Sequence, residues 1–385
     1  MKGRRILFVE ATSTGAGEAL VRACRYTNLV PILATSRLGS CSFGALFDSV
    51  VECETAEPES LLKIARRERV SAVATSHDDL VIQTASVCDQ LALPSLGVAS
   101  ATLCADKLEM RRVLDVHAPE LNLAFSTDSR DLDRPIRKPR IGNDSAGVVT
   151  VPDRERGPAE PGFFFEETVD GDEYSVTVAV REGQLIWVVP VRKTVERIGT
   201  CEFLKIGAHI AVDAGDVTLE PALARLVQAL GLGTGVVDVD LKLDRGRPRI
   251  LEVNGRMAGD QICSDLIPLS GAADPSLVAL ALAMGDEIPS LELPNANVAI
   301  RRVAPAAPCI FGGFAPPIAA DLTGLVKVTQ FRAVGQILKP SDSTAGVAGS
   351  VLCGGLSSEE AVENARRTAT FFVLRNPEWA GKDMR

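Results

Sequence analysis

Short apolar runs alternate with segments of helical period over the first hundred residues. Each run is three to five residues long, which suits a strand buried on both faces. Strands that alternate with helices in this way are typical of a parallel sheet covered by helices. The pattern therefore predicts an α/β domain at the start of the chain. Its expected elements are strands at 6–9, 30–34, 49–51 and 72–75, a helix ending near Cys24, and a helix over 60–69.

Beyond residue 100 the pattern changes to helices followed by antiparallel strands. One helix is expected from Ser100 to Val116, and polar turns at Asp170-Gly171 and Glu182-Gly183 predict two hairpins. Further helices up to Met284 and a mixed tail then complete a second unit of α+β type. The fold class expected from these patterns is α/β followed by α+β.

The clearest pair of strands is the hairpin formed by residues 235–243 and 249–254. Alternation puts Asp238 and Asp240 on one face of the first strand, and Glu252 and Asn254 on one face of the second. A turn centred on Gly246 would pair Asp240 with Glu252 and Asp238 with Asn254. The hairpin thus predicts a cluster of acidic and amide oxygens on one face of a sheet.

Two carboxylates that face each other across a sheet destabilise it unless a cation lies between them. A cluster of Asp, Glu and Asn oxygens is what Mg²⁺ accepts, together with water and substrate phosphates. The alternative is a solvated hairpin face, which is the commoner setting for acids on strands. Arg256 follows directly and can hold an anion, which favours a metal and phosphate site.

A second candidate for phosphate binding begins with a strand that carries Lys138. The strand leads into a turn of small residues between Gly142 and Gly147, which includes Asp144 and Ser145. Small side chains let backbone N–H groups approach an anion, and a lysine at the edge supplies a positive charge. The turn is a weak signal when taken alone.

The loops that follow the first strands suggest other ligand contacts. Gly15-x-Gly17 is part of a dinucleotide fingerprint, but Leu20 replaces its third glycine and no acid ends the second strand. A nicotinamide oxidoreductase is therefore disfavoured. The loops at 13–17 and 76–78 are still candidate substrate contacts, with helix capping by Ser76 or Asp78 as the alternative.

Composition and charge narrow the class of protein. The net charge of −9 and the scattered basic residues argue against a nucleic-acid partner. No apolar run is long enough to span a membrane. The nine cysteines include no Cys-x-x-Cys pair and the chain has three histidines, so neither a disulfide framework nor a zinc site is indicated. We expect a reduced, cytoplasmic protein.

The motifs in their order and spacing resemble the ATP-grasp superfamily, and within it the carboxylate-amine ligases that include the L-amino-acid ligases. The resemblance covers nearly the whole chain. It is carried by Asp106-Lys107, Lys138-Pro139, the segment 166–175 and, most specifically, Leu251-Glu-Val-Asn-Gly-Arg256. The resemblance implies a pre-ATP-grasp parallel-sheet domain followed by a two-lobed ATP-grasp fold. The implied domains are residues 1–105, a small lid lobe at 106–180, and a large lobe with a C-terminal extension at 181–385.

The resemblance also implies roles for individual residues. Lys107 and Lys138 would contact ATP phosphates, and the loop with Gly142, Ser145 and Gly147 would close over them. The hinge from Glu166 through Glu167 to Val169 would bind adenine through backbone groups, and Glu173 would bind the ribose. The implied metal ligands, for magnesium or alternatively manganese, are Asp240, Glu252 and Asn254. The implied catalytic residues are Arg256, which would steady the transferred phosphoryl group, and His209, for which a packed or exposed position is the alternative.

The implied activity is an ATP-dependent ligase that joins a small carboxylate to an amine, with amino acids expected as both substrates. An acyl phosphate would form first, and ADP and phosphate would be released. Two alternatives stay open: a ligase of carboxylase or nucleotide-precursor type, and an inactive nucleotide-binding paralogue. Asp240, where many relatives carry Glu, and Asp144 in the phosphate loop motivate the second. A homodimer is the default expectation, and such a ligase would fit natural-product biosynthesis.

Overall fold

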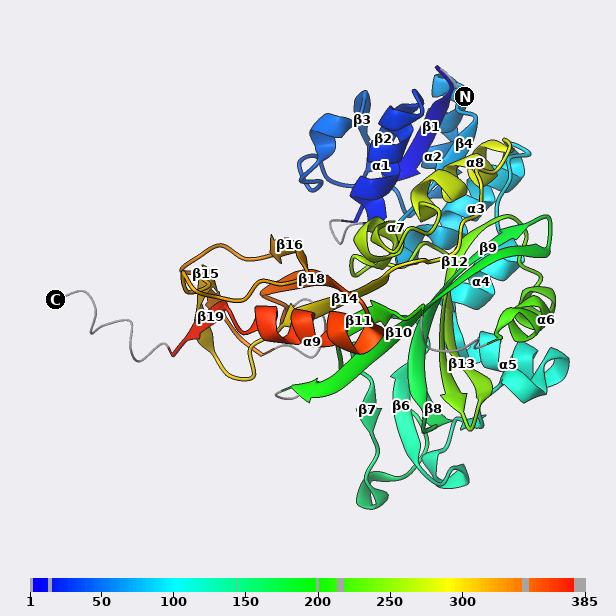
Figure 1. The fold of residues 1–385 in the computed structure, drawn as a ribbon. Helices are drawn as coiled ribbons and strands as arrows, with labels where there is room; N and C mark the ends of the chain where they lie inside the picture. The colour runs from blue at the N-terminus through cyan, green and yellow to red at the C-terminus, as the bar shows by residue number, and fades with distance from the viewer. Residues whose placement is uncertain are drawn as a thin grey trace.

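The computed structural model describes residues 3–12, 16–143, 145–198, 201–212, 218–340 and 346–376. Ser13, Gly15 and Asp144, which the sequence singled out, lie outside the described residues. In Figure 1 an N-terminal unit, a central unit and a C-terminal extension follow one another along the chain. The expected fold class, α/β followed by α+β, is confirmed.

The N-terminal unit is a four-stranded parallel sheet of order β3-β2-β1-β4. Leu7, Val9 and Ile32 on its strands pack against helix residues such as Leu61 and Val87 in one of two cores that cover the sheet. Burial on both faces explains the continuous apolar runs. The elements are β1 (Arg5–Val9), α1 (Ala16–Tyr26), β2 (Val30–Thr35), β3 (Ser49–Glu52), α2 (Pro58–Glu68), β4 (Ala72–Ala74) and α3 (Val81–Gln90).

The single helix expected from Ser100 to Val116 is wrong, because the chain forms two helices, α4 (Val98–Ala105) and α5 (Lys107–His117). Asp106 separates them with extended backbone angles, φ −105° and ψ 101°. Its carboxylate accepts hydrogen bonds from the N–H groups of Leu108 and Glu109, so it is the N-cap of α5. The break places Lys107 in the first turn of α5.

A small four-stranded antiparallel sheet of order β5-β8-β6-β7 follows. In Figure 1 its strands β6, β7 and β8 lie beyond the lower end of the large sheet. Its strands are β5 (Phe125–Ser126), β6 (Pro135–Pro139), β7 (Val149–Thr150) and β8 (Phe163–Glu167). The next strand, β9 (Asp172–Arg181), belongs to the large sheet. The hairpin expected at Asp170-Gly171 is therefore wrong, because β8 pairs with β5 and β6 whereas β9 pairs with β10 and β12.

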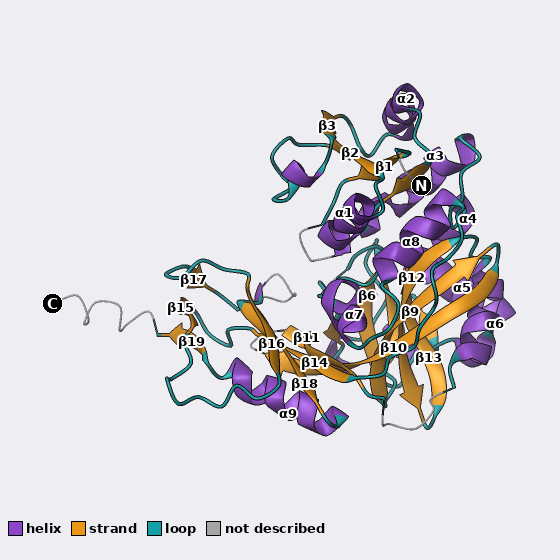
Figure 2. Cartoon of the chain, turned by 45° about the horizontal axis from the view of Figure 1, so that its top comes forward, coloured by secondary structure: helices purple, strands orange, loops and turns teal. Residues whose placement is uncertain are grey.

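The large sheet has eight antiparallel strands in the order β13-β12-β9-β10-β11-β14-β18-β16. Figure 2 shows the broad sheet between helices α5 and α6 on one side and α7 and α8 on the other. Its other strands are β10 (Gln184–Ile198), β11 (Cys201–Ile210), β12 (Gly235–Asp244), β13 (Arg247–Asn254), β14 (Asn297–Val303), β16 (Leu325–Gln330) and β18 (Gly349–Gly355), with helices α6 (Glu220–Leu230), α7 (Ile267–Leu269) and α8 (Pro275–Met284).

The C-terminal extension packs a separate small core around Phe311, Val351 and Phe372. A three-stranded sheet of order β17-β15-β19 lies at its outer end, and helix α9 covers strands of the large sheet. Its elements are β15 (Cys309–Phe314), β17 (Ile337–Leu338), α9 (Ser358–Ala369) and β19 (Phe372–Arg375). None of the helices in the described ranges is both long and apolar enough to cross a bilayer.

Candidate active site

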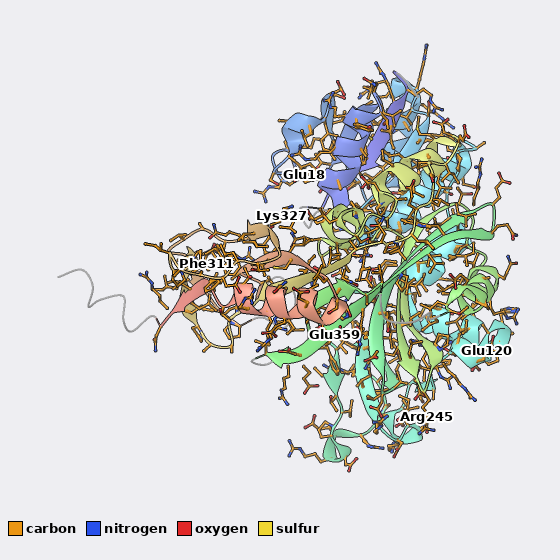
Figure 3. The ribbon with its side chains drawn as sticks, viewed as in Figure 1. Glu18, Glu120, Arg245, Phe311, Lys327 and Glu359 are labelled. Atoms are coloured by element: carbon orange, nitrogen blue, oxygen red, sulfur yellow. The ribbon has the colours of Figure 1, made fainter. Side chains whose placement is uncertain are left out.

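The acidic hairpin β12–β13 has the register expected from the sequence. Asp240 pairs with Glu252 and Asp238 pairs with Asn254. The two-residue turn is Arg245-Gly246, with φ values of 51° and 77°, and Figure 3 shows Arg245 at its tip. Positive φ at both turn residues matches the twist of the two strands, and the turn sets the pairing from Asp244–Arg247 to Leu241–Ile250. A β-bulge at Leu251 then shifts the register by one residue and brings Glu252 opposite Asp240.

Two cavities meet at this hairpin. The larger, of about 420 Å³, lies between the carboxyl ends of the N-terminal strands and the large sheet. The smaller, of about 100 Å³, lies between the small sheet and the large sheet. Asn143, Lys205, Asp240 and Glu252 line both cavities. Ligands bound in the two cavities would therefore be adjacent to each other at the acidic hairpin.

Lys107 and Lys138 both line the smaller cavity. Lys107 Nζ lies 3.3 Å from Glu252 Oε2 and donates a hydrogen bond of 2.6 Å to the carbonyl oxygen of Gly142. Lys138 Nζ lies 2.6 Å from Glu166 Oε2. Two buried cations thus face one cavity from the start of α5 and from β6.

Glu166 is buried completely and joins three elements through its side chain. Arg111 Nε on α5 donates to Glu166 Oε1 at 2.8 Å, while Lys138 holds the other carboxylate oxygen. Burial raises the pKa of Glu166, but the charges of Arg111 and Lys138 outweigh it and lower that pKa below its ordinary value. The Glu166 carboxylate therefore fixes the position of Lys138.

Lys193 and Lys205 form a pair of cations that the sequence did not single out. Their Nζ atoms lie 2.7 Å and 3.2 Å from Asp240 Oδ2, and Lys193 Nζ also lies 2.9 Å from Glu173 Oε1. Burial raises the pKa of Asp240 to about 6, although both lysines oppose that shift. The two lysines come from β10 and β11, 47 and 35 residues before Asp240 in the sequence, so no local motif predicts them.

Arg256 is held between two carboxylates. Its Nε lies 2.9 Å from Asp78 Oδ1, and its Nη1 lies 3.0 Å from Asp238 Oδ2. Burial lowers the pKa of Arg256, but Asp78 and Asp238 outweigh it and raise that pKa above its ordinary value. Arg256 thus ties the hairpin to the N-terminal unit.

Neither Ser76 nor Asp78 caps a helix, so the capping alternative for this loop is wrong. The 3-10 helix η2 (Asp78–Leu80) has no side-chain hydrogen bond at its N-cap. Ser76 Oγ instead accepts a hydrogen bond of 3.0 Å from the N–H of Thr12. Ser76 and Asp78 both line the larger cavity, as the alternative of a ligand contact requires.

The oxygen atoms of the hairpin fit a hard divalent cation shared with a phosphate. Asp240 Oδ1 is buried and has no hydrogen-bond partner among the residues that the structure describes. Burial raises the pKa of Glu252, but Lys107 and other nearby lysines outweigh it and hold that pKa well below its ordinary value, so this carboxylate is ionised. Two carboxylates with substrate phosphates are a typical Mg²⁺ environment. Within the described ranges no group of three or more His, Cys, Asp or Glu is arranged to hold a metal without such help.

Asn254, the third predicted metal ligand, lies beside Asp238 on the same hairpin. Its Nδ2 donates to Asp238 Oδ2 at 3.5 Å, and Asn254 is not among the residues that line either cavity. Its carbonyl oxygen keeps acceptor capacity. The structure therefore brings Asp240 and Glu252 to both cavities and leaves Asn254 beside Asp238.

The other predicted nucleotide contacts divide into two groups. Gly142, Ser145, Glu167, Val169 and Glu173 line the smaller cavity, whereas Gly147 does not. The Glu167 carboxylate accepts hydrogen bonds from the N–H groups at 133 and 134, so it holds a neighbouring loop. The predicted adenine contacts through the backbone stay predictions.

His209 lies on β11 but lines neither cavity. Its neighbour Ala208 pairs with Lys193 and lines the larger cavity. Successive residues of a strand point to opposite faces, so the orientation that puts Ala208 at the site turns His209 away from it.

Arg302 on β14 is a further cavity residue that the sequence did not single out. It is 5% exposed and donates hydrogen bonds to the backbone oxygens of Lys205 and Asp260. In the described part of the chain no carboxylate lies within ion-pairing distance of its guanidinium. Arg302 can therefore accept an anionic group in the larger cavity.

Residues 104–260 match the family model described as the ATP-grasp domain. Carnosine synthase 1 of Gallus gallus is 34% identical over 140 residues, which cover 34% of this chain and 14% of that protein. The chain thus spans about one seventh of the length of this curated relative.

Several solved structures share the whole architecture. The L-amino acid ligase from Bacillus licheniformis has a TM-score of 0.76 at 17% identity, over 97% of this chain and 99% of that chain. Phosphoribosylglycinamide synthetase from Anaerococcus prevotii has a TM-score of 0.75 at 16% identity, with the same coverage. N5-carboxyaminoimidazole ribonucleotide synthetase from Thermotoga maritima has a TM-score of 0.71 at 14% identity, also over 97% of this chain and 99% of that chain.

Residues 104–260 match the ATP-grasp domain model, and the chain as a whole has the ATP-grasp fold. The resemblance drawn from the sequence motifs is thereby confirmed at the level of the superfamily. The solved structures are 14–17% identical to this chain, so they establish its fold alone and not its substrates. The curated relative is matched over a limited segment.

Proposed function

We propose that the protein is an ATP-dependent carboxylate-amine ligase that forms an amide bond between two small substrates, with ADP and phosphate as products. Amino acids are the proposed substrates. The observation that carries the proposal is the meeting of two cavities at Asp240 and Glu252, with buried cations on both sides. A phosphoryl group presented from the smaller cavity is then adjacent to a carboxylate bound in the larger one.

The proposed nucleotide site is the smaller cavity. A carboxylate that attacks a phosphate meets strong repulsion, which costs on the order of 4 kcal/mol for each charge pair at about 4 Å and an effective dielectric of about 20. Lys107 and Lys138 face this cavity and would offset that repulsion. Glu173 would contact the ribose and the backbone of 166–169 the adenine, as the superfamily resemblance implies.

Asp240 and Glu252 would hold magnesium, or manganese in its place, and Asn254 would complete or support that set. When bound, the ion neutralises phosphate charge and aligns the transferred group. Lys193 and Lys205 already neutralise Asp240 Oδ2, so the unpartnered Oδ1 is the atom that would face the ion.

The proposed carboxylate site is the larger cavity. Arg302, Lys193 and Lys205 line it and would hold the carboxylate and then the acyl phosphate. Arg256 forms ion pairs with Asp78 and Asp238, so its proposed role is to hold the hairpin in position. Contact with the phosphoryl group is a second proposed role. The small sheet would close as a lid, because water hydrolyses an acyl phosphate.

The test is phosphate release from Mg·ATP in a matrix of amino-acid pairs, with mass detection of the coupled product. ADP and an amide product that require both substrates would support the ligase. ADP release that requires bicarbonate in place of an amine would point to the carboxylase type. ATP binding without ADP formation under every pair would identify a nucleotide-binding paralogue and refute the proposal. We further propose a cytoplasmic enzyme, with a homodimer as the assembly to test.

A further inference from the structure

Glu10 is a charged residue of the larger cavity that the proposed reaction does not use. It follows β1 directly, at the carboxyl edge of the parallel sheet, and it is one of the residues that line the cavity. Its backbone has a positive φ of 53°. Such a conformation is uncommon for a residue with a side chain and is often found at functional sites.

Neutral donors hold the Glu10 carboxylate in place. Oε1 accepts hydrogen bonds from the N–H of Ser36 at 2.5 Å, from Ser36 Oγ at 2.8 Å and from Thr55 Oγ1 at 3.3 Å. Oε2 accepts one hydrogen bond of 2.7 Å, from Thr35 Oγ1. Burial raises the pKa of Glu10, but these hydrogen bonds outweigh it and lower that pKa, so the carboxylate is ionised. Oε2 retains acceptor capacity.

Glu10 differs from the other acids of this cavity because its hydrogen-bond partners are neutral, whereas the other acids lie near cations. Asp78 and Asp238 pair with Arg256, Asp240 pairs with two lysines, and Glu252 pairs with Lys107. The remaining acid, Asp260, is half-buried near Arg302, whose charge lowers its pKa against the effect of desolvation. Across the described ranges of the chain, no cation lies within ion-pairing distance of Glu10.

We propose that Glu10 is a specificity-determining residue that binds an ammonium group of the carboxylate substrate. This inference rests on the proposed ligase function. An ionised, positioned carboxylate without a cation in a ligand cavity is complementary to a cationic ligand group. Arg302 and the two lysines in the same cavity would take the carboxylate, so the ligand is a zwitterion. The preferred donor is therefore an amino acid with a free amino group.

The amine that attacks is not the group that Glu10 binds. A carboxylate beside an ammonium group stabilises the charged form and would raise its pKa, whereas the attacking amine must be neutral. Glu10 would therefore orient the amino group that does not react. It would also keep that group from acting as the nucleophile in a second coupling.

A purely structural role for Glu10 is the alternative, because its hydrogen bonds join the ends of β1, β2 and β3. Measurements of stability and of KM distinguish the two roles. Loss of a structural contact lowers the stability of the N-terminal unit, whereas loss of an ammonium contact raises the KM for a zwitterionic donor and leaves the KM for ATP unchanged.

The first test uses the wild-type protein with Mg·ATP and amino-acid donors, each compared with the carboxylic acid of the same skeleton without its amino group. L-alanine with propionate is one such pair, and the other common L-amino acids and β-alanine extend the set. We expect removal of the amino group to raise the KM of the accepted donor about tenfold or more. Equal KM values for both members of every pair would overturn the inference.

The second test compares Glu10→Gln with Glu54→Gln, an exposed acid nearby. We expect Glu10→Gln to raise the KM for the amino-acid donor about tenfold, to keep the KM for ATP, and to lose discrimination against the acid without the amino group. Glu54→Gln should match the wild type. Retained discrimination in Glu10→Gln would overturn the inference, whatever its stability.

Calorimetric binding of the same paired acids in the presence of a non-hydrolysable ATP analogue separates this inference from the ligase proposal. Amino-acid binding that weakens in Glu10→Gln, without ADP formation in the wild type, would refute the ligase reaction and support the role of Glu10. Absence of amino-acid binding to the wild type would overturn the role of Glu10.

Discussion

Replacing Arg111 with Met should destabilise the protein far more than breaking an ion pair on its surface. Arg111 is fully buried and donates to Glu166 Oε1, to Asn122 Oδ1 and to the backbone oxygen of Leu251, at distances of 2.8, 3.2 and 2.8 Å. Breaking a buried ion pair by removing one partner costs about 3–5 kcal/mol. Lys138 remains 2.6 Å from Glu166, so the loss should lie near the lower end, at about 3 kcal/mol.

Urea unfolding followed by the fluorescence of Trp187, which is buried in the large sheet, measures this loss. With a slope of about 3 kcal/mol/M, the midpoint should fall by about 1 M. The matched control is Arg22→Met, which removes an exposed partner of Glu18 and should cost less than about 1 kcal/mol. Figure 3 labels Glu18 on α1.

The argument also predicts coupling between Arg111 and Glu166. In a Glu166→Gln background the buried negative charge is absent, so Arg111→Met should cost clearly less than it does in the wild type. Equal losses in the two backgrounds would show that the charge of Glu166 is not what Arg111 stabilises, and would refute the reasoning.

Three further predictions concern the site and its nearest helix. Glu252→Gln should lower the rate of phosphate release about 100-fold or more, because it weakens the proposed Mg²⁺ site; full turnover in this variant would contradict the site. Lys107→Met should raise the KM for ATP about 10-fold to 100-fold through loss of a charge-assisted phosphate contact, whereas the exposed Lys63→Met should have no effect, and equal KM values would remove Lys107 from the nucleotide site. Asp106→Ala should lower the free energy of unfolding by about 1 kcal/mol through loss of the α5 cap, as measured by urea unfolding; an unchanged midpoint would argue against the cap.

Much of the candidate site could be predicted because its signals are local. The two strands of the acidic hairpin follow from alternation and from a two-residue turn that contains Gly246, and both are properties of adjacent residues. The pairing of Asp240 with Glu252 also needs the β-bulge at Leu251, which neither signal predicts. The strand with Lys138 was recognisable for the same reason. The helix break at Asp106 was missed because the apolar period continues across it, although aspartate is a favoured N-cap residue.

The cavity residues that the sequence did not single out, and the expectation for His209, have a different explanation. Lys193, Lys205, Arg302 and Glu10 come from four separate strands or strand ends, and no motif joins them in the sequence. His209 was a candidate by its position in the chain, but the face of a strand that meets a cavity depends on its neighbours, and here that face carries Ala208.

The sequence by itself determined most of the elements, the acidic hairpin, and the resemblance to the ATP-grasp superfamily, because these depend on periodicity and on residues close together in the chain. Only the tertiary structure decided which charges meet. It paired Arg256 with Asp78 and Asp238 across 178 residues and 18 residues, and it left Glu10 with neutral donors. Ion pairing depends on distance in space and on burial, and neither quantity is encoded in spacing along the chain.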